Sequence, residues 1–250
     1  MSWQDTVILS AAFFVVATLY TTVGHAGASG YLAMMALLGV APETMRPTAL
    51  TLNILVAALT VHRFRRARYF SWPGLWPFLI GSVPFAAVGG IQSLQRDTYY
   101  VTMGAVLLLA AAYIAWRAIG PRAPMQEGIV RVRMVAAAFL GAVIGFVSGL
   151  IGVGGGIFLS PVLLILGWAG PKTTAGISAP FILVNSAVAL IAGSLTVQTL
   201  PRELPVLAGA AMAGAFLGTW LGLQYLRQTG LLLTLAFVMT LAGLKLILTA

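Results

Sequence analysis

Charged residues are scarce in this chain of 250 residues, which is 8% charged and 60% hydrophobic, with a mean hydropathy of +1.00. A soluble domain typically carries about 25% charged residues. No sizeable soluble domain is therefore expected, and most of the chain is predicted to lie in lipid.

Cysteine is absent, which excludes disulfides, thiol chemistry and iron–sulfur ligation. The zinc-protease pattern His-Glu-x-x-His and an intramembrane pair of aspartates are absent too. We therefore expect no metal site, no cofactor and no enzymatic activity.

Acidic residues number only five, and all of them fall in predicted loops or termini: Asp5, Glu43, Asp97, Glu127 and Glu203. Cation pumps and cation channels place ionisable side chains inside the membrane. The missing carboxylates argue against those classes and leave an interior that suits an anion.

The apolar runs are long and do not alternate, which favours helices over a β-barrel. The sequence predicts an all-α integral membrane protein with two repeated halves of five segments each. The second segment of each half is short; Ala28–Leu38, at ~1.5 Å per residue, falls short of a ~30 Å bilayer core. We therefore expect 8 to 10 segments in total, with short broken or re-entrant helices. The predicted segments are Thr6–Val23, Ala28–Leu38, Pro47–His62, Gly74–Gln92, Thr98–Ala118, Met134–Ile151, Gly155–Trp168, Ala175–Val197, Leu204–Tyr225 and Leu231–Leu248.

The net charge of +9 resides in short basic loops, as in membrane proteins, so no nucleic-acid partner is expected. One loop holds Arg63, Arg65, Arg66 and Arg68, and a second is flanked by Arg117, Arg122, Arg131 and Arg133. Both are expected to be cytoplasmic. No Lys or Arg precedes the first segment, which favours an external N-terminus.

A two-part organisation follows, with a first repeat over 1–120, a cytoplasmic linker over 121–133 and a second repeat over 134–250. The halves are inverted if each short segment forms a hairpin that crosses twice or not at all. They are parallel if only the short segment fails to cross. The external N-terminus favours inversion.

The densest glycine run is Gly149–Gly156, and Val23–Gly30 is its weaker echo in the first half, with Gly24 and Gly152 128 positions apart. Paired Gly-interrupted segments are typical of a transporter's binding site, because helix N-termini there can face an anion. Tight helix crossing is the alternative, and it suits the separate ladders Gly141, Gly145, Gly149 and Gly214, Gly218, Gly222. The glycines predicted to bind substrate are Gly24, Gly27, Gly152, Gly154, Gly155 and Gly156.

Several polar residues accompany the glycines. His25 could donate to an anion or carry a proton, or simply bond a nearby carbonyl. Ser29 could cap a short helix, and Asn53, Ser178 and Asn185 in the third segments are expected to face inward or to join helices. Two cations in matched loops are predicted at a cavity entrance: Arg46 and Lys172.

An intramembrane protease is the alternative from another class, since Gly27-Ala28-Ser29-Gly30 matches the Gly-x-Ser-Gly pattern of rhomboids. That chemistry needs a histidine base on a later span. His62 is the only later histidine and it lies at a predicted helix end, so this alternative is disfavoured.

The stretch Gly149-Leu-Ile-Gly-Val-Gly-Gly-Gly-Ile-Phe-Leu-Ser-Pro-Val-Leu163 closely resembles the glycine motif of the TauE/SafE sulfite exporter family, and Pro171–Ser178 also resembles it. The first-half echo departs from the motif at His25 and Ser29. The resemblance implies a bacterial inner-membrane transporter of sulfite or organosulfonates. Its expected partners are the bilayer and a small anion, with protons as coupling ions and a homodimer left open. A passive anion channel is the alternative.

Overall fold

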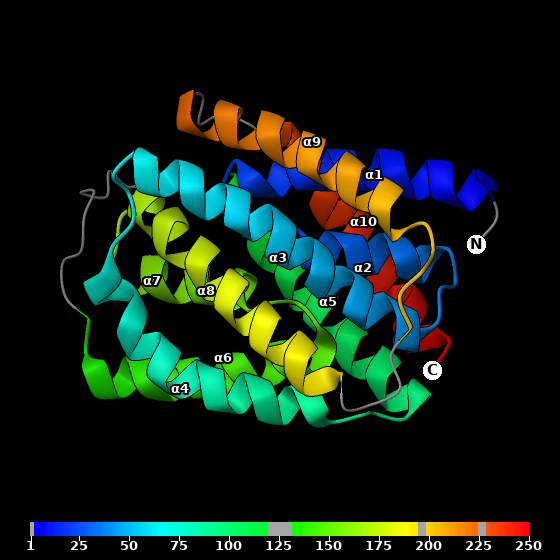
Figure 1. The fold of residues 1–250 in the computed structure, drawn as a ribbon, viewed down its shortest axis with the longest axis horizontal. Helices are drawn as coiled ribbons and strands as arrows, with labels where there is room; N and C mark the ends of the chain where they lie inside the picture. Colours follow the sequence, from blue (N-terminus) through cyan, green and yellow to red (C-terminus); the bar gives the residue numbers. More distant parts are fainter. Residues whose placement is uncertain (1–2, 120–131, 195–198, 225–228) are drawn as a thin grey trace.

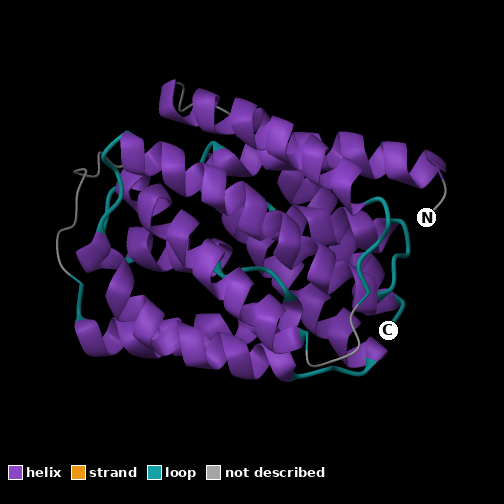
Figure 2. Ribbon diagram, viewed as in Figure 1, coloured by secondary structure: helices purple, strands orange, loops and turns teal. Residues whose placement is uncertain are grey.

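The computed structural model describes residues 3–119, 132–194, 199–224 and 229–250, and this part of the chain is helical with no strand (Figures 1 and 2). This confirms the all-α prediction. Ten helices are present among the described residues: α1 (Trp3–Thr21), α2 (Ala28–Leu37), α3 (Pro42–Arg66), α4 (Trp72–Ile91), α5 (Arg96–Ile119), α6 (Met134–Ile151), α7 (Gly156–Ile165), α8 (Pro171–Gly193), α9 (Leu204–Gln224) and α10 (Thr229–Leu248).

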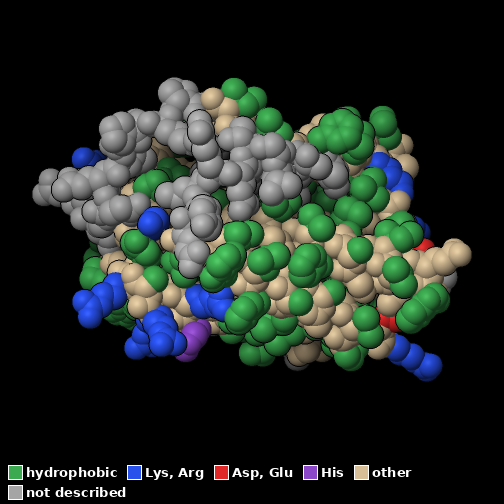
Figure 3. Space-filling view, turned by 90° about the horizontal axis from the view of Figure 1, so that it is seen from above, with side chains coloured by type: hydrophobic (Ala, Val, Ile, Leu, Met, Phe, Trp, Pro, Cys, Tyr) green, Lys and Arg blue, Asp and Glu red, His purple; other side chains and the backbone are tan. Residues whose placement is uncertain are grey.

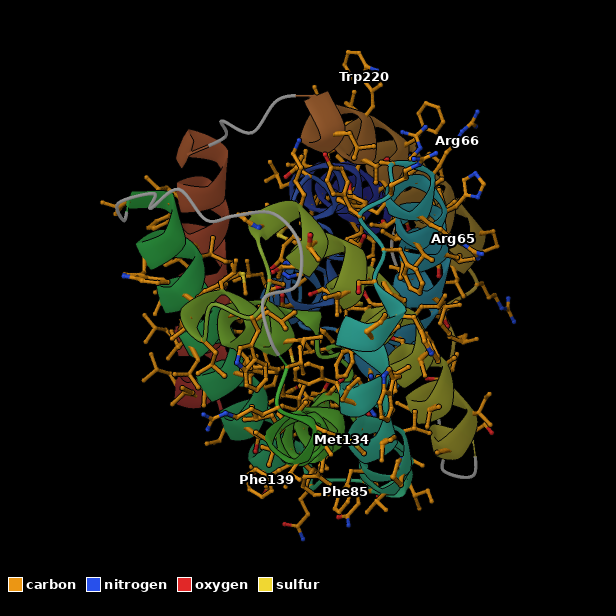
Figure 4. The ribbon with its side chains drawn as sticks, turned by 90° about the vertical axis from the view of Figure 1, so that its left-hand side faces the viewer. Arg65, Arg66, Phe85, Met134, Phe139 and Trp220 are labelled. Atoms are coloured by element: carbon orange, nitrogen blue, oxygen red, sulfur yellow. The ribbon has the colours of Figure 1, made fainter. Side chains whose placement is uncertain are left out.

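Seven of the described helices are long and apolar enough to cross a membrane: α1, α3, α4, α5, α6, α8 and α9. Large apolar side chains such as Phe85, Phe139 and Trp220 are exposed and point away from the bundle (Figure 4). Helices α2 and α7 have 10 residues each, so each spans only about half of a bilayer core. The chain is a multi-pass membrane protein with two short helices inside its bundle.

The direction of the helices differs between the halves (Figure 1). Helices α1 and α3 begin at the same end of the molecule. Helix α1 runs away from that end, and α2 leads the chain back to it. Helices α6 and α8 begin at the opposite end. Helix α6 runs away from that end, and α7 leads the chain back to it. Across the halves, α1 packs on α9, α4 on α6, α3 on α8 and α5 on α10. The repeat itself stays a prediction.

The glycine ladders serve close packing, as predicted. A Cβ atom at Gly141, Gly145 or Gly149 of α6 would lie 2.2–2.4 Å from a backbone oxygen of α4. The second ladder on α9, Gly214, Gly218 and Gly222, meets backbone oxygens of α1 and of Thr22 directly after it equally closely. These two crossings therefore bring helix backbones into direct contact, which small residues permit in lipid.

Several helices begin a few residues earlier than predicted, and the displacement is largest for α3 and α8. Helix α3 starts at Pro42 rather than Pro47, and α8 starts at Pro171 rather than Ala175. Pro47 lies inside α3, where its missing N–H frees the carbonyl of Glu43, and the Thr199 N–H donates to that carbonyl at 3.2 Å. Pro47 is thus tolerated inside the helix, and Arg46 and Lys172 lie near the starts of helices rather than in loops.

The acidic residues that the structure describes lie toward one end of the molecule, whereas basic residues occur at both ends (Figure 3). Arg65 and Arg66 lie where α3 ends, which we call the arginine end (Figure 4), and basic side chains gather at that end in Figure 3. Four acidic residues precede or open helices that begin at the opposite end: Asp5, Glu43, Asp97 and Glu203. Most of the predicted 121–133 linker lies outside the described residues. That the arginine end is cytoplasmic stays a prediction.

Single cysteines in this Cys-free chain test that orientation, because Arg66 and Ala41 are both exposed and lie at opposite ends of α3. With an impermeant thiol reagent, we expect Ala41→Cys to be labelled in intact cells and Arg66→Cys only after lysis. The reverse labelling pattern would overturn the orientation.

Candidate functional site

Both short helices begin at a glycine in the left-handed conformation. Gly27 precedes α2 with φ 103°, and Gly155 precedes α7 with φ 82°. Other residues are disfavoured there by about 1–2 kcal/mol. No side chain caps either helix, so the expectation that Ser29 is a cap is wrong: Gly27 holds the cap position, and Ser29 lies in the first turn of α2.

The first glycine turn, residues 22–27, packs on the second half of the chain. A Cβ atom at Gly24 would lie 2.3 Å from Cβ of Ala175 in α8. The buried His25 ring has Nε2 2.6 Å from Oγ of Ser160 in α7, and that Oγ lies 2.9 Å from Oγ of Ser178 in α8. A buried hydrogen-bonded chain therefore joins the first turn to α7 and α8.

The second glycine turn, residues 152–155, packs on α3 and α8. Nδ2 of Asn53 donates to the Val153 carbonyl at 3.2 Å and to Oγ of Ser186 at 3.3 Å. A Cβ atom at Gly154 would lie 2.5 Å from that same Nδ2 and 2.7 Å from Oγ of Ser186. Asn53 thus bonds the non-helical backbone between α6 and α7. It lies so close to Gly154 that a side chain at that position would clash with it.

Ile182 of α8 connects the two turns. A Cβ atom at Gly156 would lie 2.3 Å from Cδ1 of Ile182 and 3.4 Å from Cδ2 of His25. The side chain of Ile182 also lies 3.0 Å from the Cβ position of Gly154. The structure therefore gathers one group of residues around the start of α7, which we call the central cluster: His25, Asn53, Gly154, Gly156, Ser160, Ser178, Ile182 and Ser186.

Three buried oxygens at or beside this cluster have no hydrogen-bond partner among the described residues: Oδ1 of Asn53, Oδ1 of Asn185 and Oγ of Ser148. Ser148 Oγ lies 3.3 Å from the Cβ position of Gly155, at the start of α7. Leaving a buried polar group unpaired costs about 1–3 kcal/mol, and native proteins contain few such groups. Unpartnered buried oxygens of this kind are typical of sites that bind a ligand or water.

Other predicted residues have different surroundings. The Ser29 hydroxyl lies 2.6 Å from the hydroxyl of Tyr20, away from the His25 chain. Asn185 donates from Nδ2 to the Phe181 carbonyl of its own helix at 2.8 Å. The Nζ atom of Lys172 lies 5.3 Å from the ring centre of Tyr69.

Arg46 is buried, and its guanidinium donates to the carbonyls of Gly89, Gly90 and Gln92 at the end of α4. A cation is favoured at a helix C-terminus because the backbone carbonyls there are unpaired. Its Cγ also lies 2.9 Å from the Cβ position of Gly152. Arg46 therefore ties α3, α4 and the second glycine turn together.

Sequence reasoning missed Ser160 and Ser148. Ser160 lies in the apolar run of α7, where a lone hydroxyl among aliphatic residues was the available signal. Ser148 stands among small residues of α6, and nothing in the sequence distinguishes it from a packing residue. Their roles became visible only from the neighbours that the fold gives them.

A family model described as sulfite exporter TauE/SafE matches residues 9–246. A probable membrane transporter protein, y4hK, from Sinorhizobium fredii is 39% identical over 239 residues, which cover 96% of this chain and 97% of that protein. A probable membrane transporter protein from Xylella fastidiosa is 35% identical over 105 residues, covering 42% of this chain and 40% of that protein. No solved structure matches the chain.

Two glycines with positive φ make a matched pair for testing the packing of the second turn. Gly154 (φ 77°) contacts Asn53 and Ser186, whereas a Cβ at Gly167 (φ 63°) would meet nothing within 4 Å. We expect Gly154→Ala to destabilise the protein by roughly 1–3 kcal/mol more than Gly167→Ala, because both carry the backbone strain but only the first is overpacked. Thermal unfolding in detergent measures the difference. Equal shifts for the two variants would show that the turn is not tightly packed.

Proposed function

We propose that this chain, which belongs to the sulfite exporter TauE/SafE family of membrane transporters, carries a small sulfur-containing anion such as sulfite or an organosulfonate across the bacterial inner membrane. The observation that supports the substrate class is the central cluster itself. Two broken helices from the two halves meet there, around buried polar groups, and no carboxylate belongs to it.

The starts of α2 and α7 suit an anion. The first N–H groups of a helix lack acceptors within the helix, and the helix dipole places about half a positive charge there. The hydroxyls of Ser160 and Ser178 and the ring of His25 add groups that can donate hydrogen bonds beside the start of α7. The described acidic residues lie at the outer ends of helices, so they do not repel a central anion.

The substrate-binding residues we propose are the glycines of both turns with His25, Ser29, Asn53, Ser178 and Asn185. Ser29 and Asn185 differ from the others in that their described hydrogen bonds go to Tyr20 and to the α8 backbone. Arg46 and Lys172 remain the proposed cations that attract the anion toward the site.

Alternating access is the mechanism we propose, with inverted halves that rock against each other around the anion. The opposite directions of the two helix pairs α1–α2 and α6–α7 support this arrangement. The cross-half hydrogen bonds of His25 to Ser160 and of Asn53 to Val153 would break or re-form as the halves move.

A serine protease is not supported, because the chain belongs to a family of transporters. In addition, the Ser29 hydroxyl is paired with Tyr20, while the Nε2 atom of His25 is directed to Ser160. Ser29 therefore has no histidine base in the described structure.

Vesicles that contain the purified protein test the transport function. With labelled sulfite and an imposed pH gradient, we expect accumulation beyond equilibrium, which collapses when a protonophore removes the gradient. Flux that only follows the sulfite gradient would overturn the proposed coupling to protons and favour a passive pathway. Absence of any sulfite or sulfonate flux would refute the proposed substrate class.

His25 tests the coupling. We expect His25→Leu to reduce sulfite transport by about tenfold, because it removes a buried hydrogen-bonding group. His25→Gln should retain more transport but lose the response to the pH gradient, since an amide does not titrate. The control is His62→Leu, at an exposed position near the arginine end of α3. Normal rate and pH response in His25→Leu would assign His25 a purely structural role.

A further inference from the structure

Two of the unpartnered buried atoms among the described residues are oxygens that cannot donate a hydrogen bond. Most of the atoms without a partner among the described residues are hydroxyls, which can donate or accept. Oδ1 of Asn53 and Oδ1 of Asn185 are amide oxygens, which can only accept. Both side chains are fully buried. The molecule therefore presents two buried positions that require a donor.

The orientation of both amides is fixed by their neighbours. Nδ2 of Asn53 donates to the Val153 carbonyl, and Nδ2 of Asn185 donates to the Phe181 carbonyl. Turning either amide over would set its oxygen against a carbonyl oxygen, where neither can donate. The unpartnered atoms are therefore acceptors and cannot be exchanged for N–H groups.

Asn53 lies at the anion site proposed above. Its amide touches the second glycine turn at Val153 and at the Cβ position of Gly154. Two residues further, Gly156 opens α7, whose N–H groups and dipole favour negative oxygens. A ligand between α3 and the start of α7 thus meets donors on one side and an amide acceptor on the other.

A fully deprotonated anion fits this combination poorly, because its oxygens can only accept and would face the oxygen of Asn53. An alkanesulfonate has the same defect, since its alkyl group leaves that oxygen unpaired. An anion with one O–H group satisfies both sides. Its charged oxygens accept from the helix start, and its O–H donates to Oδ1 of Asn53.

We propose that the site selects a monovalent oxyanion that carries its own O–H donor, of which hydrogensulfite is the simplest, over sulfite dianion and over alkanesulfonates. This rests on the proposed function and narrows its substrate class. A site built around a donated hydrogen bond rejects analogues that lack the donor, because the buried partner is then left unpaired.

Two monovalent anions separate the possibilities. Hydrogensulfite and methanesulfonate are compared at one acidic pH, as competitors for binding to the purified full-length protein. Both carry a single negative charge on sulfur-bound oxygens, and only the first has an O–H donor. We expect hydrogensulfite to bind at least about tenfold more tightly.

Asn53→Leu removes the acceptor. We expect it to reduce the preference for hydrogensulfite over methanesulfonate to less than about threefold, chiefly because hydrogensulfite binds more weakly. Thr51→Val is the matched control on the same helix, because the Thr51 hydroxyl bonds the Pro47 carbonyl of its own helix at 2.8 Å. It should keep the wild-type preference.

Equal affinity of the wild-type protein for the two anions overturns this inference while leaving the proposed function in place, and it would assign water to the Asn53 oxygen. The wild-type comparison does not depend on how well Asn53→Leu folds. Binding of neither anion would refute the proposed function and this inference together. An unchanged preference in a correctly folded Asn53→Leu would also overturn it, since the selectivity would then arise elsewhere.

Discussion

Backbone N–H and C=O groups outside a helix can lie at membrane depth only when the protein supplies hydrogen-bond partners or a cavity for them. The organisation of this chain follows from that constraint. The chain interrupts a helix in each half, between α1 and α2 and between α6 and α7. Each interruption is covered by helices from the other half: α7 and α8 cover the first, and α3 covers the second. Each half therefore covers the interrupted helix of the other half, and polar groups at the two interruptions, such as His25 and the Val153 carbonyl, lie inside the bundle.

Glycine serves two distinct purposes in this arrangement. On α6 and α9 it removes side chains so that backbones touch along two long crossings, which fixes α4 and α1 in place. In the turns it allows backbone conformations and distances that a Cβ atom would prevent, as at Gly154 beside Asn53. The first use brings long helices into direct contact, and the second places the starts of the short helices inside the bundle.

Two cations, the buried Arg46 and the partly buried Lys245, also have structural roles at helix ends. Arg46 bonds the carbonyls that end α4, and Lys245 of α10 bonds the Ala36 and Leu37 carbonyls that end α2. In both cases the negative end of a helix replaces an acidic side chain. This explains how a chain with five acidic residues places positive side chains at helix ends inside the bundle.

The sequence by itself determined that the chain is an all-helical membrane protein with short helices at the two glycine motifs, because hydropathy, run length and glycine density act locally. It also indicated the family, through a contiguous motif over 149–163. The sequence placed the start of α3 too late, at Pro47, because a proline inside a helix resembles one that opens it until a partner such as Thr199 bonds the freed carbonyl. It also placed the start of α8 too late, at Ala175 rather than at Pro171. The centre was decided only by the tertiary structure. That His25 meets Ser160, that Asn53 meets Val153, and that Asn53 and Asn185 keep unpaired oxygens all depend on contacts between residues that lie far apart in sequence or on what surrounds a buried atom. No local pattern encodes which face of α3 meets the α6–α7 turn, because that contact arises from the packing of one half against the other.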